Sequence, residues 1–188
     1  MKVLVIGEDP THDQFILRPV VEAVLEAADL RARVEVLTDP PLGGIEDALD
    51  SRQLAAILHD NPMIDLFLLI VDRDCDRKRN TSRAQARPDA FPGRLIACVA
   101  WQEVEVWMLA LHREHLVETW STVRAHWDPK EAFVDSVLDR IGRAGPAGGR
   151  KAAMRSISGQ WRTLVSTCPE LRELVDAVRA WSAGRAPG

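Results

Sequence analysis

The sequence predicts an α/β protein, in which an open, mostly parallel sheet is flanked by helices and followed by a C-terminal helical extension. Short apolar runs alternate with segments of helical spacing over the first 115 residues. The most apolar run, residues 66–71, has no polar alternation, which is typical of a central parallel strand buried on both faces. Beyond residue 115 the strand pattern ends. We therefore expect an α/β domain over residues 1–115 and a helical extension over residues 116–188, packed on it.

The strands and helices of the predicted domain follow one another in a regular order. The strands are expected over residues 3–6, 34–37, 66–71 and 95–100. The helices are expected over residues 15–30, 45–59 and 103–115. Residues 72–94 are rich in arginine and too polar for a core, so a loop is expected there.

The last third of the chain carries helical patterns without strands. Residues 116–139 are predicted to be helical or irregular, and the four glycines of residues 142–149 indicate a flexible loop. Helical patterns then cover residues 151–166 and 170–182. No apolar stretch of about 18 residues and no signal peptide is apparent, so we expect no membrane span and a cytoplasmic location.

Charge is distributed in blocks along the 188 residues, whose formal net charge is −4. Residues 1–70 hold 5 basic and 13 acidic side chains, whereas residues 140–188 hold 9 basic and 3 acidic ones. The total excludes a polybasic protein that coats nucleic acid by bulk charge. It leaves open a local cationic surface beside an acidic site. Three scattered cysteines are too few for a disulfide framework or a zinc site.

Carboxylates follow three of the four predicted strands. They are Glu8, Asp72, Asp74, Glu103 and Glu105. In open parallel sheets, ligands bind beyond the carboxyl ends of the strands, and Mg²⁺ prefers oxygen ligands. Each residue also has an ordinary interpretation, because single acids are common in turns and in the first turn of a helix. Taken together, they predict a site for Mg²⁺ or Mn²⁺.

The motifs around these acids resemble the Toprim domain of topoisomerases, primases, OLD-type nucleases and small stand-alone proteins. The resemblance rests on the strand and glutamate of residues 3–8, on Leu-Ile-Val-Asp-Arg-Asp at residues 69–74, and on Glu-Val-Glu-Val-Trp at residues 103–107. Lys151 and residues 168–171 extend it loosely into the C-terminal part. Two departures are Asp9, where relatives usually have glycine, and Asp13, which stands in for a glutamate.

The resemblance implies a role for each acid. Glu8 would be the general acid/base and a metal ligand, Asp72 and Asp74 would bind Mg²⁺, and Glu103 with Glu105 would be further ligands. Small Toprim-like proteins are often encoded beside ATPases and are suspected parts of mobile-element or phage-defence systems. A partner ATPase is therefore expected, and the oligomeric state stays open.

Basic residues directly follow the predicted metal ligands. They are Arg73, Arg77, Lys78, Arg79 and Arg83. They are expected either to hold a nucleic-acid backbone or to form a solvated loop paired with the aspartates. Lys151 lies by a glycine-rich loop that lacks the Walker pattern, and it would be a catalytic lysine that stabilises charge on a phosphate.

The aromatic and histidine side chains indicate a functional site less clearly than the acidic residues do. Trp101 is expected either to pack in the fold or to stack on a base near the site. The five histidines show no paired metal spacing, and His112 with His115 is typical of a polar helix end.

Three functions fit these observations. The first is a Mg²⁺-dependent nuclease that acts without a covalent intermediate, since the chain has no tyrosine for topoisomerase-type chemistry. The second is a non-catalytic module that binds nucleic acid or a partner ATPase. The third, a phospho-receiver domain, is disfavoured because Ala100 and Trp101 stand where a receiver needs serine or threonine.

Overall fold

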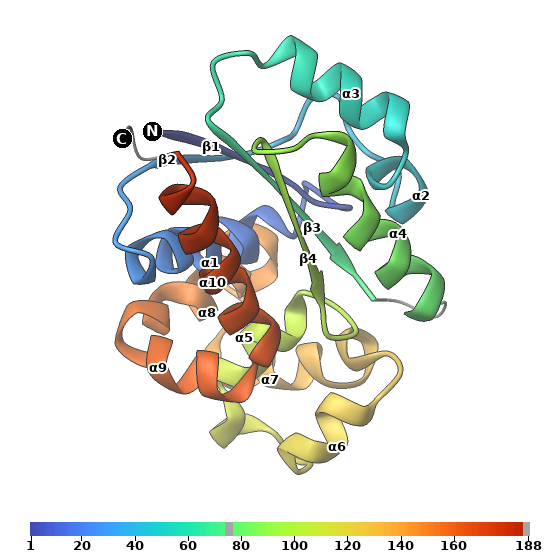
Figure 1. Cartoon of the computed structure of the whole chain (residues 1–188). Helices are drawn as coiled ribbons and strands as arrows, with labels where there is room; N and C mark the ends of the chain where they lie inside the picture. The colour runs from blue at the N-terminus through green and yellow to red at the C-terminus, as the bar shows by residue number, and fades with distance from the viewer. Residues whose placement is uncertain (74–76, 186–188) are drawn as a thin grey trace.

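The computed structural model describes residues 1–73 and 77–185 and has a four-stranded, all-parallel sheet flanked by helices (Figure 1). This confirms the predicted fold class. The strands are β1 (Lys2–Ile6), β2 (Arg33–Val36), β3 (Leu66–Asp72) and β4 (Leu95–Ala100), in the order β2-β1-β3-β4. The two central strands, β1 and β3, therefore end side by side, and β4 ends next to β3.

Five helices belong to the region that contains the strands. They are α1 (Gln14–Ala27), α2 (Ile45–Ala48), α3 (Ser51–Asp60), α4 (Arg77–Ala90) and α5 (Glu105–Leu111). The C-terminal extension is helical, as predicted. It contains η1 (Arg113–His115), α6 (Trp120–Ala125), η2 (Lys130–Val134), α7 (Asp135–Ile141), η3 (Pro146–Gly149), α8 (Arg150–Ala153), η4 (Met154–Ser156), α9 (Ile157–Thr167) and α10 (Pro169–Ala183).

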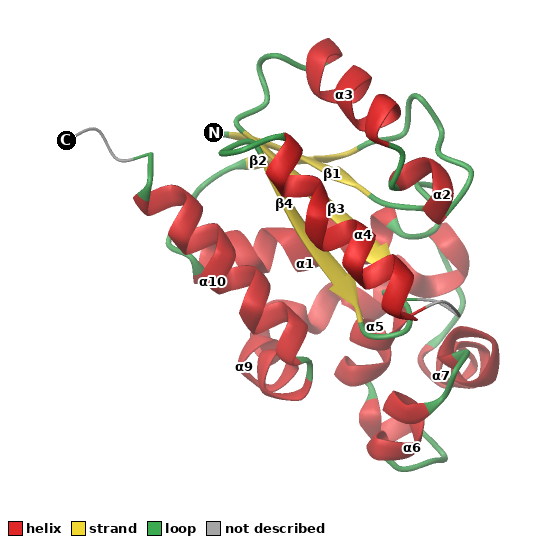
Figure 2. Cartoon of the chain, turned by 45° about the vertical axis from the view of Figure 1, so that its right-hand side comes forward, coloured by secondary structure: helices red, strands yellow, loops and turns green. Residues whose placement is uncertain are grey.

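The sheet separates two hydrophobic cores, because successive side chains of a strand point to opposite faces. Val3 and Val5 of β1 belong to a core shared with α1, α5 and the C-terminal helices. Leu4 and Ile6 belong to a second core under α2, α3 and α4. The helices accordingly form one layer on each side of the sheet (Figure 2). Buried residues of the extension, such as Val137, lie in the same core as Val5.

Two local predictions were wrong. The helix expected over residues 45–59 is two helices, because the Asp50 carboxylate accepts hydrogen bonds from the backbone N–H groups of Arg52 and Gln53, both at 2.8 Å, and starts α3. The loop expected over residues 72–94 contains the 14-residue helix α4. Its many arginines are good helix formers, and it buries Ala84 against the sheet.

The glycine-rich segment makes a tight turn. Gly142, Gly145, Gly148 and Gly149 all have positive φ, and a β-carbon on Gly149 would collide with the backbone oxygen of Gly142. The glycines are therefore required by backbone geometry. Among the described residues, no helix combines the length and the apolar character needed to cross a membrane.

Candidate functional site

Five carboxylates gather where β1, β3 and β4 end, and we call them the acidic cluster: Glu8, Asp13, Asp72, Glu103 and Glu105. Glu8 follows β1, Asp13 precedes α1, and Asp72 is the last residue of β3. Glu105 is the first residue of α5, and Glu103 lies two residues before it. Asp13 and Glu105 are buried, which is unusual for acidic side chains. The parallel topology thus brings together residues that are far apart in the sequence.

Hydrogen bonds fix the two central carboxylates. The backbone N–H of Asp72 donates to Glu8 Oε1 at 2.7 Å. In turn, Asp72 Oδ1 accepts from the backbone N–H of Val104 at 2.9 Å. These bonds tie the end of β1 to the end of β3, and the end of β3 to the start of α5. Glu8 and Asp72 are therefore held in place by the main chain of their neighbours.

Glu105 links the acidic cluster to the helical extension through ion pairs, and we call it the anchor of the cluster. It is fully buried, and its Oε1 lies 3.3 Å from both Lys130 Nζ and Arg150 Nη2. Its second oxygen, Oε2, is buried without a hydrogen-bond partner. The backbone N–H of Lys130 also donates to Glu103 Oε2 at 2.8 Å. The helical extension therefore supplies two positive charges and one backbone donor to acids at the sheet edge.

Burial and mutual repulsion shift the protonation of these acids. Burial, followed by the negative charges of Glu8 and the other carboxylates, raises the pKa of Asp72 well above its usual value. Burial, with Glu105 nearby, raises the pKa of Asp13 to about 7. The pKa of Glu103 is likewise raised by burial to about 7. These three acids therefore keep their protons to a higher pH than ordinary carboxylic acids do.

A pocket of about 360 Å³ opens onto the cluster. Glu8, Asp13, Asp72 and Lys130 line it, together with residues 41–44 from the loop after β2. Its charged donors are carboxylate oxygens, the ligand type that Mg²⁺ and Mn²⁺ prefer. Glu105 Oε2 is buried without a hydrogen-bond partner, so it is an acceptor that a proton or a cation would satisfy. Carboxylates are thus the donor type that a hard divalent cation takes. Among the described residues, however, no three of these carboxylates bring one oxygen each within 4.8 Å of one another.

Most of the predicted metal ligands meet at this site. Glu8, Asp72, Glu103 and Glu105 lie together, while Asp74 is outside the described residues. Lys151 does not line the acidic pocket. It lines a separate pocket of about 270 Å³ with Phe15, Arg18 and Met154.

Sequence reasoning missed two members of the site, Asp13 and Lys130. Asp13 was noted only as a departure from the Toprim motif, where it stands in for a glutamate, although its place in the loop after a strand was a usable signal. Lys130 belongs to the extension, and its sequence carries no signal for this position. The path of the chain between α6 and α7 places it there.

Of the predicted nucleic-acid-binding residues whose side chains the structure describes, none lines the acidic pocket. Lys78, Arg79 and Arg83 lie on α4, where Arg83 and Arg79 are 2.8 and 3.6 Å from Glu46 of α2. Arg77 is the first residue of α4. Salt bridges to α2 therefore engage two of these side chains on the far side of the sheet from the extension.

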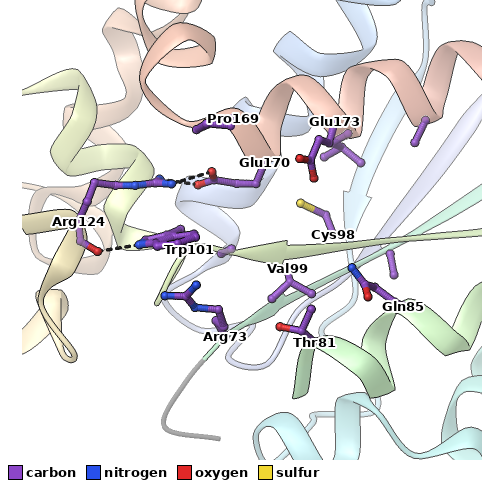
Figure 3. A pocket seen from close by; sticks show the side chains of 14 residues that line it. Arg73, Thr81, Gln85, Cys98, Val99, Trp101, Arg124, Pro169, Glu170 and Glu173 are labelled. Atoms are coloured by element: carbon purple, nitrogen blue, oxygen red, sulfur yellow. Dashed lines mark hydrogen bonds and ion pairs between the residues drawn. The ribbon is translucent and has the colours of Figure 1, made fainter. Parts of the chain in front are cut away.

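Arg73 faces a second pocket of about 410 Å³, between β4, α4 and α10 (Figure 3). Its guanidinium lies 3.6 Å from the centre of the Trp101 ring, and that of Arg124 lies 4.7 Å from it. Trp101 Nε1 donates to the backbone oxygen of Arg124 at 2.6 Å. Arg124 also pairs with Glu170 of α10. These contacts favour a packing role for Trp101 over base stacking.

Comparisons with protein-family models, with curated proteins and with solved structures found no match to this chain.

Proposed function

We propose that this protein is a Mg²⁺-dependent phosphodiester hydrolase that acts on nucleic acid. The observation that carries the proposal is the gathering of five carboxylates near Asp72, three of which, Glu8, Asp13 and Asp72, line one pocket. Such a concentration of negative charge is unfavourable unless cations offset it, and Lys130 and Arg150 offset only part. Oxygen ligands at the carboxyl ends of parallel strands suit a divalent cation that meets a phosphate.

The acidic side chains and Lys130 would have different roles in the reaction. Asp72 and Glu8 would hold the cation, with Glu103 and Asp13 within reach of the same charge. When bound, Mg²⁺ would polarise the phosphate and lower the pKa of a bound water. Glu8 would accept a proton from the attacking water, as its resemblance to the Toprim glutamate suggests. Lys130 lines the pocket and would bring positive charge to the phosphate, a role expected of Lys151 from the sequence.

The test is cleavage of DNA and RNA by the purified full chain with Mg²⁺ or Mn²⁺. Wild type is expected to cleave one of them, and Asp72→Asn should lower the rate by at least about 100-fold. Glu118→Gln is the matched control, because Glu118 is an exposed carboxylate remote from the acidic pocket's lining. Equal rates for wild type and Asp72→Asn would reject the proposal, since the cleavage would then come from a contaminant.

The ion pairs and backbone hydrogen bonds that the acidic cluster already makes within the protein support a second function. Glu105 is held by two cationic side chains, and Glu8, Asp72 and Glu103 each accept a backbone hydrogen bond. Such satisfied acids would suit a non-catalytic module that binds nucleic acid or a partner ATPase. This alternative predicts Mg²⁺ binding without cleavage. A place in a mobile-element or phage-defence system is a further proposal that rests only on the Toprim resemblance.

A further inference from the structure

Two histidines and a glutamate gather at the end of α5, away from the acidic pocket. We call them the histidine cluster: His112, Glu114 and His115. The helix changes here from α to 3₁₀ geometry, with η1 spanning Arg113–His115. In a 3₁₀ turn, residues three apart lie directly above one another. The two imidazole rings are accordingly stacked, with centroids 6.1 Å apart and planes 24° apart.

A backbone hydrogen bond fixes the tautomer of His112. Its Nε2 lies 2.8 Å from the carbonyl oxygen of Ala153 in α8. A carbonyl can only accept, so Nε2 must carry the proton, and Nδ1 of the neutral ring has a free lone pair. Histidines that bind metals commonly donate their other ring N–H to a carbonyl or carboxylate in this way. His112 is therefore oriented as metal ligands are.

The donor atoms lie close to one another. Glu114 Oε1 is 3.9 Å from His112 Nδ1 and 3.6 Å from His115 Nε2. One donor atom from each residue falls within 4.8 Å of the others. Ligands bound to Zn²⁺ at about 2.0–2.1 Å in a tetrahedral site are roughly 3.4 Å apart. Small side-chain rotations close this gap, because Glu114 and His115 are 64% and 35% exposed, while His112 is held at 13%.

We propose that the histidine cluster binds one divalent transition-metal ion of the zinc class. His112 Nδ1, His115 Nε2 and a Glu114 oxygen would be the protein ligands, and water would complete the coordination. Two imidazole nitrogens and one carboxylate suit Zn²⁺, Co²⁺ or Ni²⁺, whereas the oxygen-only acidic cluster suits Mg²⁺. The proposed site is therefore separate from the proposed hydrolytic site in both place and chemistry.

The experiment titrates the chelator-treated full chain with Zn²⁺ in a calorimeter. Wild type is expected to bind one ion per chain, and His115→Gln and His112→Gln should each bind it at least about tenfold more weakly. His115→Gln leaves the His112–Ala153 bond intact, so a loss of affinity there does not depend on a change in folding. Circular dichroism of each variant checks that the fold is retained.

His59→Gln is the matched control. His59 lies 3.0 Å from Asp60 and is 88% exposed, so it offers an imidazole and a carboxylate without the second histidine. Its Zn²⁺ affinity should equal that of wild type. Undiminished binding by His115→Gln would overturn the proposal, as would a loss of binding that follows Asp72→Asn instead. A strong thiolate-to-metal band in the Co²⁺ spectrum would also overturn it.

Discussion

The acidic cluster and the histidine cluster are built in opposite ways. The acids come from segments as distant as Glu8 and Glu105, and the fold buries two of them and half-buries the other three. The histidine cluster comes from four consecutive residues, and much of its surface is exposed. The first arrangement depends on the whole fold, whereas the second depends on a single helical turn and one backbone bond to Ala153. Damage to the first should therefore cost stability, and damage to the second should not.

The largest expected loss of stability comes from replacing Glu105, the anchor of the acidic cluster. Glu105→Ala would leave Lys130 and Arg150 without their common partner, and Arg150 is only 13% exposed. Breaking a buried ion pair by removing one partner costs about 3–5 kcal/mol. We expect the free energy of unfolding, measured in urea, to fall by that amount.

A smaller loss for Glu105→Ala would contradict the view that Glu105 anchors the cluster. The double variant Glu105→Ala/Arg150→Met serves as the control. It removes a buried positive charge together with the negative one, so it should recover part of the stability. A double variant no more stable than Glu105→Ala would show that packing, and not unpaired charge, dominates the loss.

The next prediction separates the two clusters by metal. Each ion should stabilise the folded chain by about 2.7 kcal/mol at a concentration 100 times its dissociation constant. Asp72→Asn should lower the stabilisation by Mg²⁺ and leave that by Zn²⁺ unchanged. His115→Gln should lower the stabilisation by Zn²⁺ to about 1.4 kcal/mol or less and leave that by Mg²⁺ unchanged. Thermal unfolding in the presence of each ion measures the stabilisation by Mg²⁺ and by Zn²⁺. A single variant that abolishes both effects would show that the two clusters are not independent.

The third prediction concerns pH in the absence of metal. The pKa of Asp13 is about 7 in the fold, against 3.8 for the ordinary side chain. The folded state therefore binds this proton more tightly than the unfolded state does. The stabilisation is complete below pH 3.8 and is lost as the pH rises through 7.

Asp13→Asn should remove part of this slope. The amide cannot ionise, and its oxygen can still accept from the backbone N–H of Asp9, a bond of 3.3 Å in the fold. Relative to wild type, we expect the variant to gain about 3–4 kcal/mol at pH 8 over its difference at pH 4. Urea unfolding with a chelator at the two pH values measures this. Parallel pH dependence of the two proteins would contradict the role assigned to Asp13.

The same contrast explains what the sequence could predict. The four strands and four of the five acids were found because buried runs and strand ends are local signals. Helix α4 was missed because it buries few side chains, so its composition resembles a loop. Lys130 was missed because its position depends on how the extension folds back. The stacking of His112 on His115 was not predicted, because the change to 3₁₀ geometry that produces it leaves no mark in their spacing.

The smallest expected change in stability comes from replacing Glu114, the glutamate of the histidine cluster. Glu114 is 64% exposed, and its neighbours are imidazoles at 3.6 and 3.9 Å, so Glu114→Gln should change the free energy of unfolding by less than about 0.5 kcal/mol. The same variant should still weaken Zn²⁺ binding, because an amide is a poorer ligand than a carboxylate. Urea unfolding and Zn²⁺ calorimetry measure the two effects separately. A destabilisation as large as that of Glu105→Ala would break the comparison, since the local cluster would then support the fold.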